Sequence, residues 1–263
     1  GRLGPALRHL GQERSWLQRE GPPTRLVTCL CELAQVHLRL GHLDAAAEAL
    51  REAHRVAFAE GLGHLVARAG IVRARLLVVL GQAGRAAQEL ERAWLAGSAQ
   101  SSVADRCAWL EARVEARLLA GDRNAASVAA GRIAALADPA GLSVQGAWSR
   151  GLYGLLRGDA ESLARAVEEL QAQGARAPLA RVLLQAGSLG DPEVLAMAID
   201  EARLGADLPL LLSCLHASGG EAERREAAVL ARTLLDNSSG ARRELLVARP
   251  SVSWALGRLG SRG

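Results

Sequence analysis

The chain has 263 residues, of which 49% are hydrophobic, and this amount of apolar surface argues against overall disorder. Its formal charge is +4 and all 32 basic residues are arginine, but arginines and carboxylates alternate, as in Arg51, Glu52 and Arg55. That pattern indicates solvated helix faces and argues against the clustered cations of a nucleic-acid-binding surface. Four scattered cysteines argue against a disulfide framework and fit a reducing, cytoplasmic setting.

The apolar residues are mostly Ala and Leu, with one Phe, one Tyr and five Trp, and this favours helices over strands. No apolar run approaches the roughly 20 residues needed to span a bilayer, so no membrane segment is predicted. The first segment, Pro5–Gln18, is expected to be the second helix of an interrupted hairpin. Because the only methionine is Met197, we expect the chain to be processed or to belong to a longer polypeptide.

A repeated unit follows along the chain: an apolar helix, a glycine, a polar residue and an alanine-rich amphipathic helix. The clearest copy has a first helix over Leu26–Leu40, a turn at Gly41, and a second helix that begins at Asp44. The same arrangement recurs around Gly81 and Gly121, so the turn glycines are spaced by 40 residues twice. The recurrence predicts a stack of antiparallel helix hairpins.

The residue types in the repeat have physical reasons. Gly permits the tight turn between two helices, and Ala lets the helices approach closely while Leu fills the gaps. A glutamate in place of Ala46 or Ala86 is therefore expected to unfold the array. The run Asp191, Pro192, Glu193 predicts a strong helix start, since it combines an N-cap, a first-turn proline and a favourable charge for the helix dipole.

After Gly121 the spacing of the repeat becomes shorter, with turns predicted at Gly158 and Gly190. The chain is then expected to form a hairpin of Leu208–His216 with Ala222–Leu235 and terminal helices over Ala241–Val247 and Ser251–Leu259. The predicted organisation is a trailing helix at 1–23, hairpins near 24–60, 62–98, 102–137, 141–173, 175–205 and 206–237, and capping helices at 238–263. A single hairpin cannot bury its second face, so the fold predicted is an all-α array of about six stacked antiparallel hairpins.

Within residues 24–136 the pattern resembles the tetratricopeptide repeat. Its small, glycine and alanine positions are matched by Leu33, Ala34, Gly41, Ala46, Leu50 and Ala53. The spacing of 40 exceeds the family's usual length of about 34 residues, and it looks like the longer hairpins of large bacterial signalling proteins, including transcription regulators of the maltose-regulator type. The chain departs from the family at the aromatic positions, which hold Leu30 and His37, and in lacking a closing proline. The resemblance implies a right-handed α-solenoid.

The resemblance also implies a concave groove that holds an extended peptide or a helix of a partner. The groove positions of the repeat, carried onto this chain, fall on Gln35, Arg39, Arg68, Ile71, Arg75, Glu111, Glu115, Gln145 and Trp148. We expect Arg68 and Arg75 to pair with carboxylates of the partner and Trp148 to supply contact area, so changing both arginines to glutamate should abolish partner capture and leave helicity intact. The alternatives left open are that the arginines are merely solvated and that Trp148 belongs to the core.

Motifs for catalysis or metal binding are not evident. Cys29 and Cys31 would point about 200° apart on a helix, so they do not form the paired ligands of a zinc site with His37, His42 or His54. There is no G-x-S-x-G motif, and each cysteine has apolar neighbours. We therefore predict no catalytic residues, no cofactor and no metal.

The function predicted is a non-catalytic interaction scaffold, the repeat segment of a larger bacterial signalling protein, which binds a protein, a peptide or another domain of its own polypeptide. An alternative is the regulatory arm of a multidomain protease, kinase or ATPase whose active site lies outside this chain. A solenoid that binds nucleic acid or a small molecule ranks below both. The sequence leaves the partner's identity and the oligomeric state open.

Overall fold

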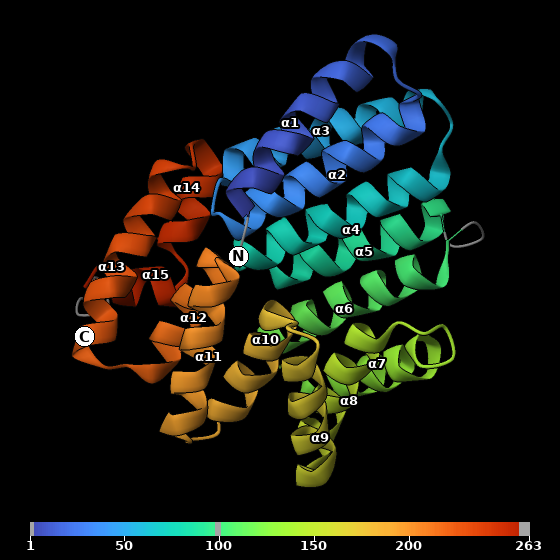
Figure 1. The fold of residues 1–263 in the computed structure, drawn as a ribbon. Coiled ribbons are helices and arrows are strands. Elements are labelled where there is room, and N and C mark those ends of the chain that lie inside the picture. Colours follow the sequence, from blue (N-terminus) through green and yellow to red (C-terminus); the bar gives the residue numbers. More distant parts are fainter. Residues whose placement is uncertain (1–2, 98–100, 258–263) are drawn as a thin grey trace. The chain divides into compact units, whose positions relative to one another are not determined.

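The computed structural model describes residues 3–97 and 101–257, and every regular element in these residues is an α-helix (Figure 1). The helices are α1 Leu3–Glu20, α2 Pro23–Arg39, α3 Leu43–Ala59, α4 Gly63–Val79, α5 Ala83–Gly97, α6 Val103–Leu119, α7 Arg123–Ala137, α8 Ser143–Arg157, α9 Ala160–Ala172, α10 Arg176–Gly187, α11 Pro192–Gly205, α12 Leu208–Ser218, α13 Glu221–Asp236, α14 Gly240–Val247 and α15 Pro250–Ala255. The predicted all-α fold is confirmed. The parts of the predicted segments at residues 1–2, 98 and 258–263 lie outside the described residues.

The chain divides into two compact units. Arg2–Leu38 and His42–Arg132 form the first, called here the N-terminal unit, and Arg39–Gly41 with Ile133–Gly263 belong to the second, the C-terminal unit. The division falls inside α7, so the N-terminal unit carries α1 to α6 and the C-terminal unit carries α8 to α15.

Consecutive helices pack against each other within each unit. In the N-terminal unit α3 packs on α4, α4 on α5, and α5 on α6, while the first helices of successive hairpins, α4 and α6, also contact each other. In the C-terminal unit α8, α10 and α12 contact one another in the same order, and each packs on the second helix of its own hairpin. Contact between neighbouring first helices is the packing expected of stacked hairpins, so a helical repeat is present in both units.

The glycines that recur every 40 residues adopt the conformation that the turns require. Gly41, Gly81 and Gly121 have φ angles of +74°, +77° and +77°, in the left-handed region that L side chains rarely enter. In each turn the residue after the glycine donates its backbone N–H to a carbonyl in the last turn of the first helix, as His42 does to His37 at 2.9 Å. The glycine spacing in the sequence therefore corresponds to a repeated backbone geometry.

Small residues let the helices of a hairpin approach closely. A Cβ atom added at Gly70 of α4 would lie 2.9 Å from the Cβ atom of Ala93 on α5, closer than such atoms are found in proteins. Ala46 on α3 and Ala86 on α5 have no exposed surface, with 0% exposure each. The burial of Ala46 and Ala86 bears out the expectation that alanine lies where helices pack, and Gly70 is a close contact that the repeat pattern did not predict.

The helix start at α11 follows the sequence signal, and the one at α3 departs from it. Asp191 caps α11 as predicted, since its Oδ1 accepts hydrogen bonds from the backbone N–H groups of Glu193 and Val194 at 3.0 and 3.2 Å. The prediction that α3 begins at Asp44 is wrong, because α3 begins at Leu43. The side chain of Leu43 is fully buried, and packing of this leucine favours a helix that starts one residue earlier.

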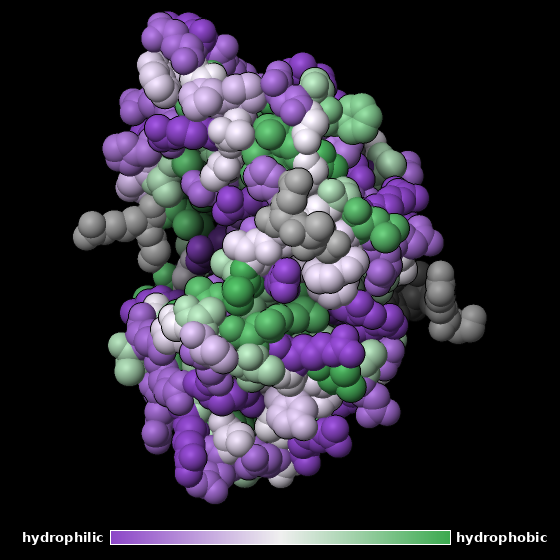
Figure 2. Space-filling view, turned by 90° about the vertical axis from the view of Figure 1, so that its right-hand side faces the viewer, coloured by the Kyte–Doolittle hydropathy of each residue, from purple (hydrophilic) through white to green (hydrophobic). Residues whose placement is uncertain are grey.

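The surface mixes polar residues with scattered apolar ones. The face in Figure 2 is mainly hydrophilic, and its apolar residues form smaller, separate patches. Phe58, Leu95 and Val229 are among the large apolar side chains that are more than half exposed, at 75%, 83% and 61%. Within the described residues, no helix is both long and apolar enough to cross a membrane.

Candidate functional site

The predicted groove residues all lie on first helices of hairpins, as their positions in the repeat require. Gln35 and Arg39 are on α2; Arg68, Ile71 and Arg75 on α4; Glu111 and Glu115 on α6; Gln145 and Trp148 on α8. Arg39, Gln145 and Trp148 belong to the C-terminal unit and the other six to the N-terminal unit.

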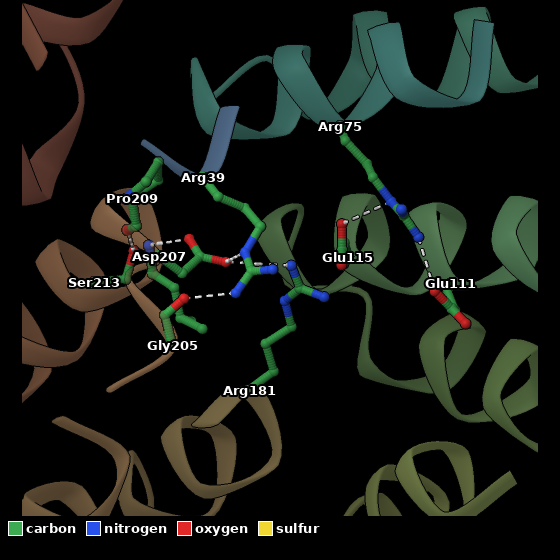
Figure 3. Close-up of polar contacts among 10 residues, drawn as sticks. Arg39, Arg75, Glu111, Glu115, Arg181, Gly205, Asp207, Pro209 and Ser213 are labelled. Carbon is green, nitrogen blue, oxygen red and sulfur yellow. Dashed lines mark hydrogen bonds and ion pairs between the residues drawn. The ribbon is translucent and has the colours of Figure 1, made fainter. Parts of the chain in front are cut away.

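Three of these residues meet in the N-terminal unit. Nη2 of Arg75 donates a hydrogen bond to Oε2 of Glu111 at 2.8 Å, and its Nε lies 3.9 Å from Oε2 of Glu115 (Figure 3). The two glutamates are one turn apart on α6, so both face the same neighbouring helix. All three side chains are largely buried, with exposures of 18%, 18% and 15%. The charge of Arg75 is thus engaged within the protein, and the cluster binds α4 to α6.

Arg68 differs from Arg75 although the two share a face of α4. The two residues are seven positions apart, which corresponds to nearly two helical turns, so their side chains leave the helix in similar directions. Within the described residues, Arg68 has no hydrogen bond and no carboxylate within ion-pair distance, and its side chain is half-buried. The charge of Arg68 acts on Cys31 of α2 and favours a lower pKa for this thiol. Burial has the larger effect and raises that pKa to about 12. Arg68 is therefore a cation without a local counter-ion, placed where α4 faces α2.

The residues of this surface follow the repeat period. Gln35, Arg75 and Glu115 are each 40 residues apart, so they occupy the same position in three successive hairpins. Gln35 is half-buried and, like Arg68, makes no hydrogen bond to a described residue. The surface of α2, α4 and α6 that carries Gln35, Arg68, Arg75, Glu111 and Glu115 forms the first-helix face.

Two of the predicted groove residues lie in the core. Ile71 is 5% exposed and Trp148 is 4% exposed. The indole Nε1 of Trp148 is buried and has no acceptor among the described residues. This placement corresponds to the alternative in which Trp148 is a core residue, so no aromatic side chain is available for a partner at this position. Gln145, one turn before it on α8, is half-buried.

Arg39 lies in a polar cluster of the C-terminal unit. Asp207 is 5% exposed and caps α12, where its Oδ1 accepts a hydrogen bond from the N–H of Leu210 at 3.2 Å. Its Oδ2 lies 3.9 Å from Nε of Arg39 and 3.7 Å from Nη2 of Arg181, and Nη2 of Arg39 donates to the carbonyl of Gly205 at 2.6 Å (Figure 3). The sequence reasoning missed Asp207 and Arg181. The segment Asp207-Leu-Pro carries the same N-cap signal as Asp191-Pro and would have identified the aspartate.

The cysteines are reduced and buried, and their environments suppress thiol chemistry. Burial raises the pKa of Cys29 to about 11 and those of Cys31 and Cys214 to about 12, and it also raises the pKa of Cys107. Since the thiolate is the nucleophilic form, these groups are held in their unreactive state at neutral pH.

Alkylation is expected to show this directly. Iodoacetamide at about pH 8 should label none of Cys29, Cys31, Cys107 and Cys214 in the folded chain within the time that labels all of them in urea, because the thiolate fraction and access are both low. The raised pKa values also make the free energy of unfolding depend on pH. The contribution of the buried thiols is fully present below the ordinary thiol pKa of 9.0, and it is lost as the pH rises toward the folded-state values, because the unfolded chain ionises first. Intact-mass spectrometry gives the count, and rapid labelling of a folded thiol would contradict its burial.

Comparison with known proteins adds no family assignment. No protein-family model matches the chain, and no curated protein sequence is significantly similar to it. The candidate site is accordingly defined by the helical repeat and by the charges of the first-helix face.

Proposed function

We propose that this chain is a non-catalytic interaction module of the tetratricopeptide-like kind, and that the first-helix face of its N-terminal unit holds a segment of a partner protein or of another domain. The observation that carries the proposal is the contrast between two arginines on one face. Arg75 is neutralised by Glu111 and Glu115, whereas Arg68 has no counter-ion among the described residues.

The chemistry of the face indicates what it would bind. A half-buried guanidinium without a counter-ion gains a charge-assisted hydrogen bond when a carboxylate approaches, and such bonds are about twice as strong as neutral ones. Gln35 adds a neutral donor and acceptor on the neighbouring first helix. A partner segment with an acidic side chain at Arg68 and polar groups beside it therefore fits the face best.

The cysteines and the resemblance to signalling repeats also support the proposed binding role. The four cysteines are buried with raised pKa values, so none of them is an activated nucleophile. Free thiols also fit the cytoplasm, where we place the protein. The resemblance to the long hairpins of bacterial signalling proteins supports a role as the repeat segment of such a protein, with regulation by the bound partner.

Separate charge reversals test the proposal. Arg68→Glu should abolish capture of the partner from native lysate and leave the melting temperature nearly unchanged, because Arg68 makes no internal ion pair to a described residue. Arg75→Glu should instead lower the free energy of unfolding by about 2–4 kcal/mol, since it brings a third carboxylate to Glu111 and Glu115. Captured proteins are identified by mass spectrometry, and stability is measured by circular dichroism.

Arg55→Glu is the matched control. Arg55 is exposed on α3, a second helix, and the substitution makes the same change in charge away from the first-helix face. Equal capture by Arg68→Glu and by Arg55→Glu would show that the partner does not use Arg68. The structure also makes Arg68→Glu a cleaner probe than the double arginine variant, whose loss of capture would include the loss of the Arg75 cluster.

A further inference from the structure

Two histidines face each other across the turn between α2 and α3. His37 lies in the last turns of α2, and His42 immediately precedes α3. Their Nδ1 atoms are 3.3 Å apart, with ring centroids separated by 5.5 Å and ring planes inclined by 49°. The backbone holds this arrangement, since the N–H of His42 donates to the carbonyl of His37 at 2.9 Å. Both histidines belong to the N-terminal unit.

Two facing Nδ1 atoms at this distance can bond directly to each other or share a ligand. In a neutral imidazole one nitrogen carries a proton and the other a lone pair, so either one Nδ1–H donates to the other Nδ1, or both lone pairs point to a shared cation. Two nitrogen ligands at about 2.0–2.1 Å from a tetrahedral Zn²⁺ are about 3.3–3.4 Å apart. The observed separation of 3.3 Å equals that edge.

We propose that His37 and His42 form a two-histidine binding site for a divalent transition-metal ion of the zinc type. The site is independent of the first-helix face and of the partner proposed for it. Its ligands are the two Nδ1 atoms, and the side chain of His42 makes no helix-capping bond that would occupy its ring. Both side chains are half-buried, so solvent reaches the pair.

The surroundings set the limits of the site. Among the described residues there is no group of three or more His, Cys, Asp or Glu side chains placed to share a metal, so water completes the coordination. Arg14 of α1 is a charged side chain that acts on His37. The charge of Arg14 is offset by Glu52, whose Oε2 lies 2.5 Å from its Nη2.

A bound ion would connect the end of α2 to the beginning of α3. It would thus reinforce the turn at Gly41, whose φ angle is +74°, and stabilise the first hairpin by binding only the folded chain. The expected result is a melting temperature that rises with zinc concentration in the wild type.

Zinc chloride titrated into the full chain, with any affinity tag removed, tests the site. At about pH 7.5, where histidine is largely neutral, calorimetry should show one ion bound per chain, and ¹⁵N-histidine spectra should show coordination through Nδ1 of His37 and His42. His37→Gln and His42→Gln should each weaken binding by at least about tenfold and remove the zinc-dependent rise in melting temperature. His54→Gln, which alters a half-buried histidine of α3, should change neither.

Two outcomes would overturn the proposal. One is a wild-type chain that binds no zinc and whose spectra show a simple Nδ1–H donation between the two rings. The other is binding that survives both His37→Gln and His42→Gln, which would place the ion elsewhere. Circular dichroism of each variant verifies that the helices are retained.

Discussion

Replacing Ala86 by glutamate is expected to unfold the N-terminal unit. Ala86 is 0% exposed and lies on the face of α5 that also carries Leu90 and Ala93, which are 1% and 3% exposed. A carboxylate there has neither water nor a partner, and its burial costs several kcal/mol against a total stability of about 5–15 kcal/mol for a typical domain. The larger side chain also forces apart α4 and α5, which pack closely.

The measurement is urea unfolding followed by far-ultraviolet circular dichroism. Ala46→Glu, at the equivalent position of α3 and also 0% exposed, should behave in the same way. Gln88→Glu is the control, because it introduces a glutamate at an exposed position of α5 and should unfold at the wild-type urea concentration. A folded Ala86→Glu variant with a normal transition would show that the helices do not pack at this alanine.

The helical hairpins were predictable because they rest on local signals. A glycine after each apolar helix corresponds to a left-handed turn at Gly41, Gly81 and Gly121, and this conformation is nearly specific to glycine. The turn after α11 was harder to recognise, since Ala206 adopts a φ angle of +53° there without a glycine. The predicted start of α3 at Asp44 was wrong because it used only the local signal of the aspartate. The burial of Leu43 in the core favours a helix that begins at Leu43.

The candidate site was less predictable, because pairing depends on how neighbouring helices are rotated. The repeat identified Arg68 and Arg75 as residues of one face, yet only the ion pairs of Arg75 with α6 distinguish the paired arginine from the unpaired one. Glu89 is a similar case: in the sequence it is one more charge of an amphipathic helix, but it is 6% exposed and pairs with Arg73 of α4. The repeat pattern predicts which helix face a charged residue occupies. The packing of neighbouring helices determines which side chain it pairs with.

Replacing Trp109 by alanine is expected to be the most destabilising truncation in the N-terminal unit, at about 3–5 kcal/mol. Trp109 is 7% exposed on α6, and its Nε1 donates a hydrogen bond to the carbonyl of Leu90 on α5 at 2.8 Å. Its ring lies 4.7 Å from that of Trp94, centroid to centroid, and the guanidinium of Arg113 lies 5.0 Å from its centroid. One side chain therefore joins the second helix of one hairpin to the first helix of the next.

Trp109→Phe separates the two contributions of this side chain. Phenylalanine keeps the aromatic contact with Trp94 but removes the indole N–H that donates to the carbonyl of Leu90, so the expected loss is about 1–2 kcal/mol. Trp16→Ala is the matched control, since the same truncation at a tryptophan that is 44% exposed on α1 should change stability by about 0.5 kcal/mol or less. If Trp109→Ala and Trp16→Ala had equal effects in urea unfolding, the contact between α5 and α6 would not depend on Trp109. If Trp109→Phe cost as much as Trp109→Ala, the hydrogen bond to Leu90 would carry the stabilisation.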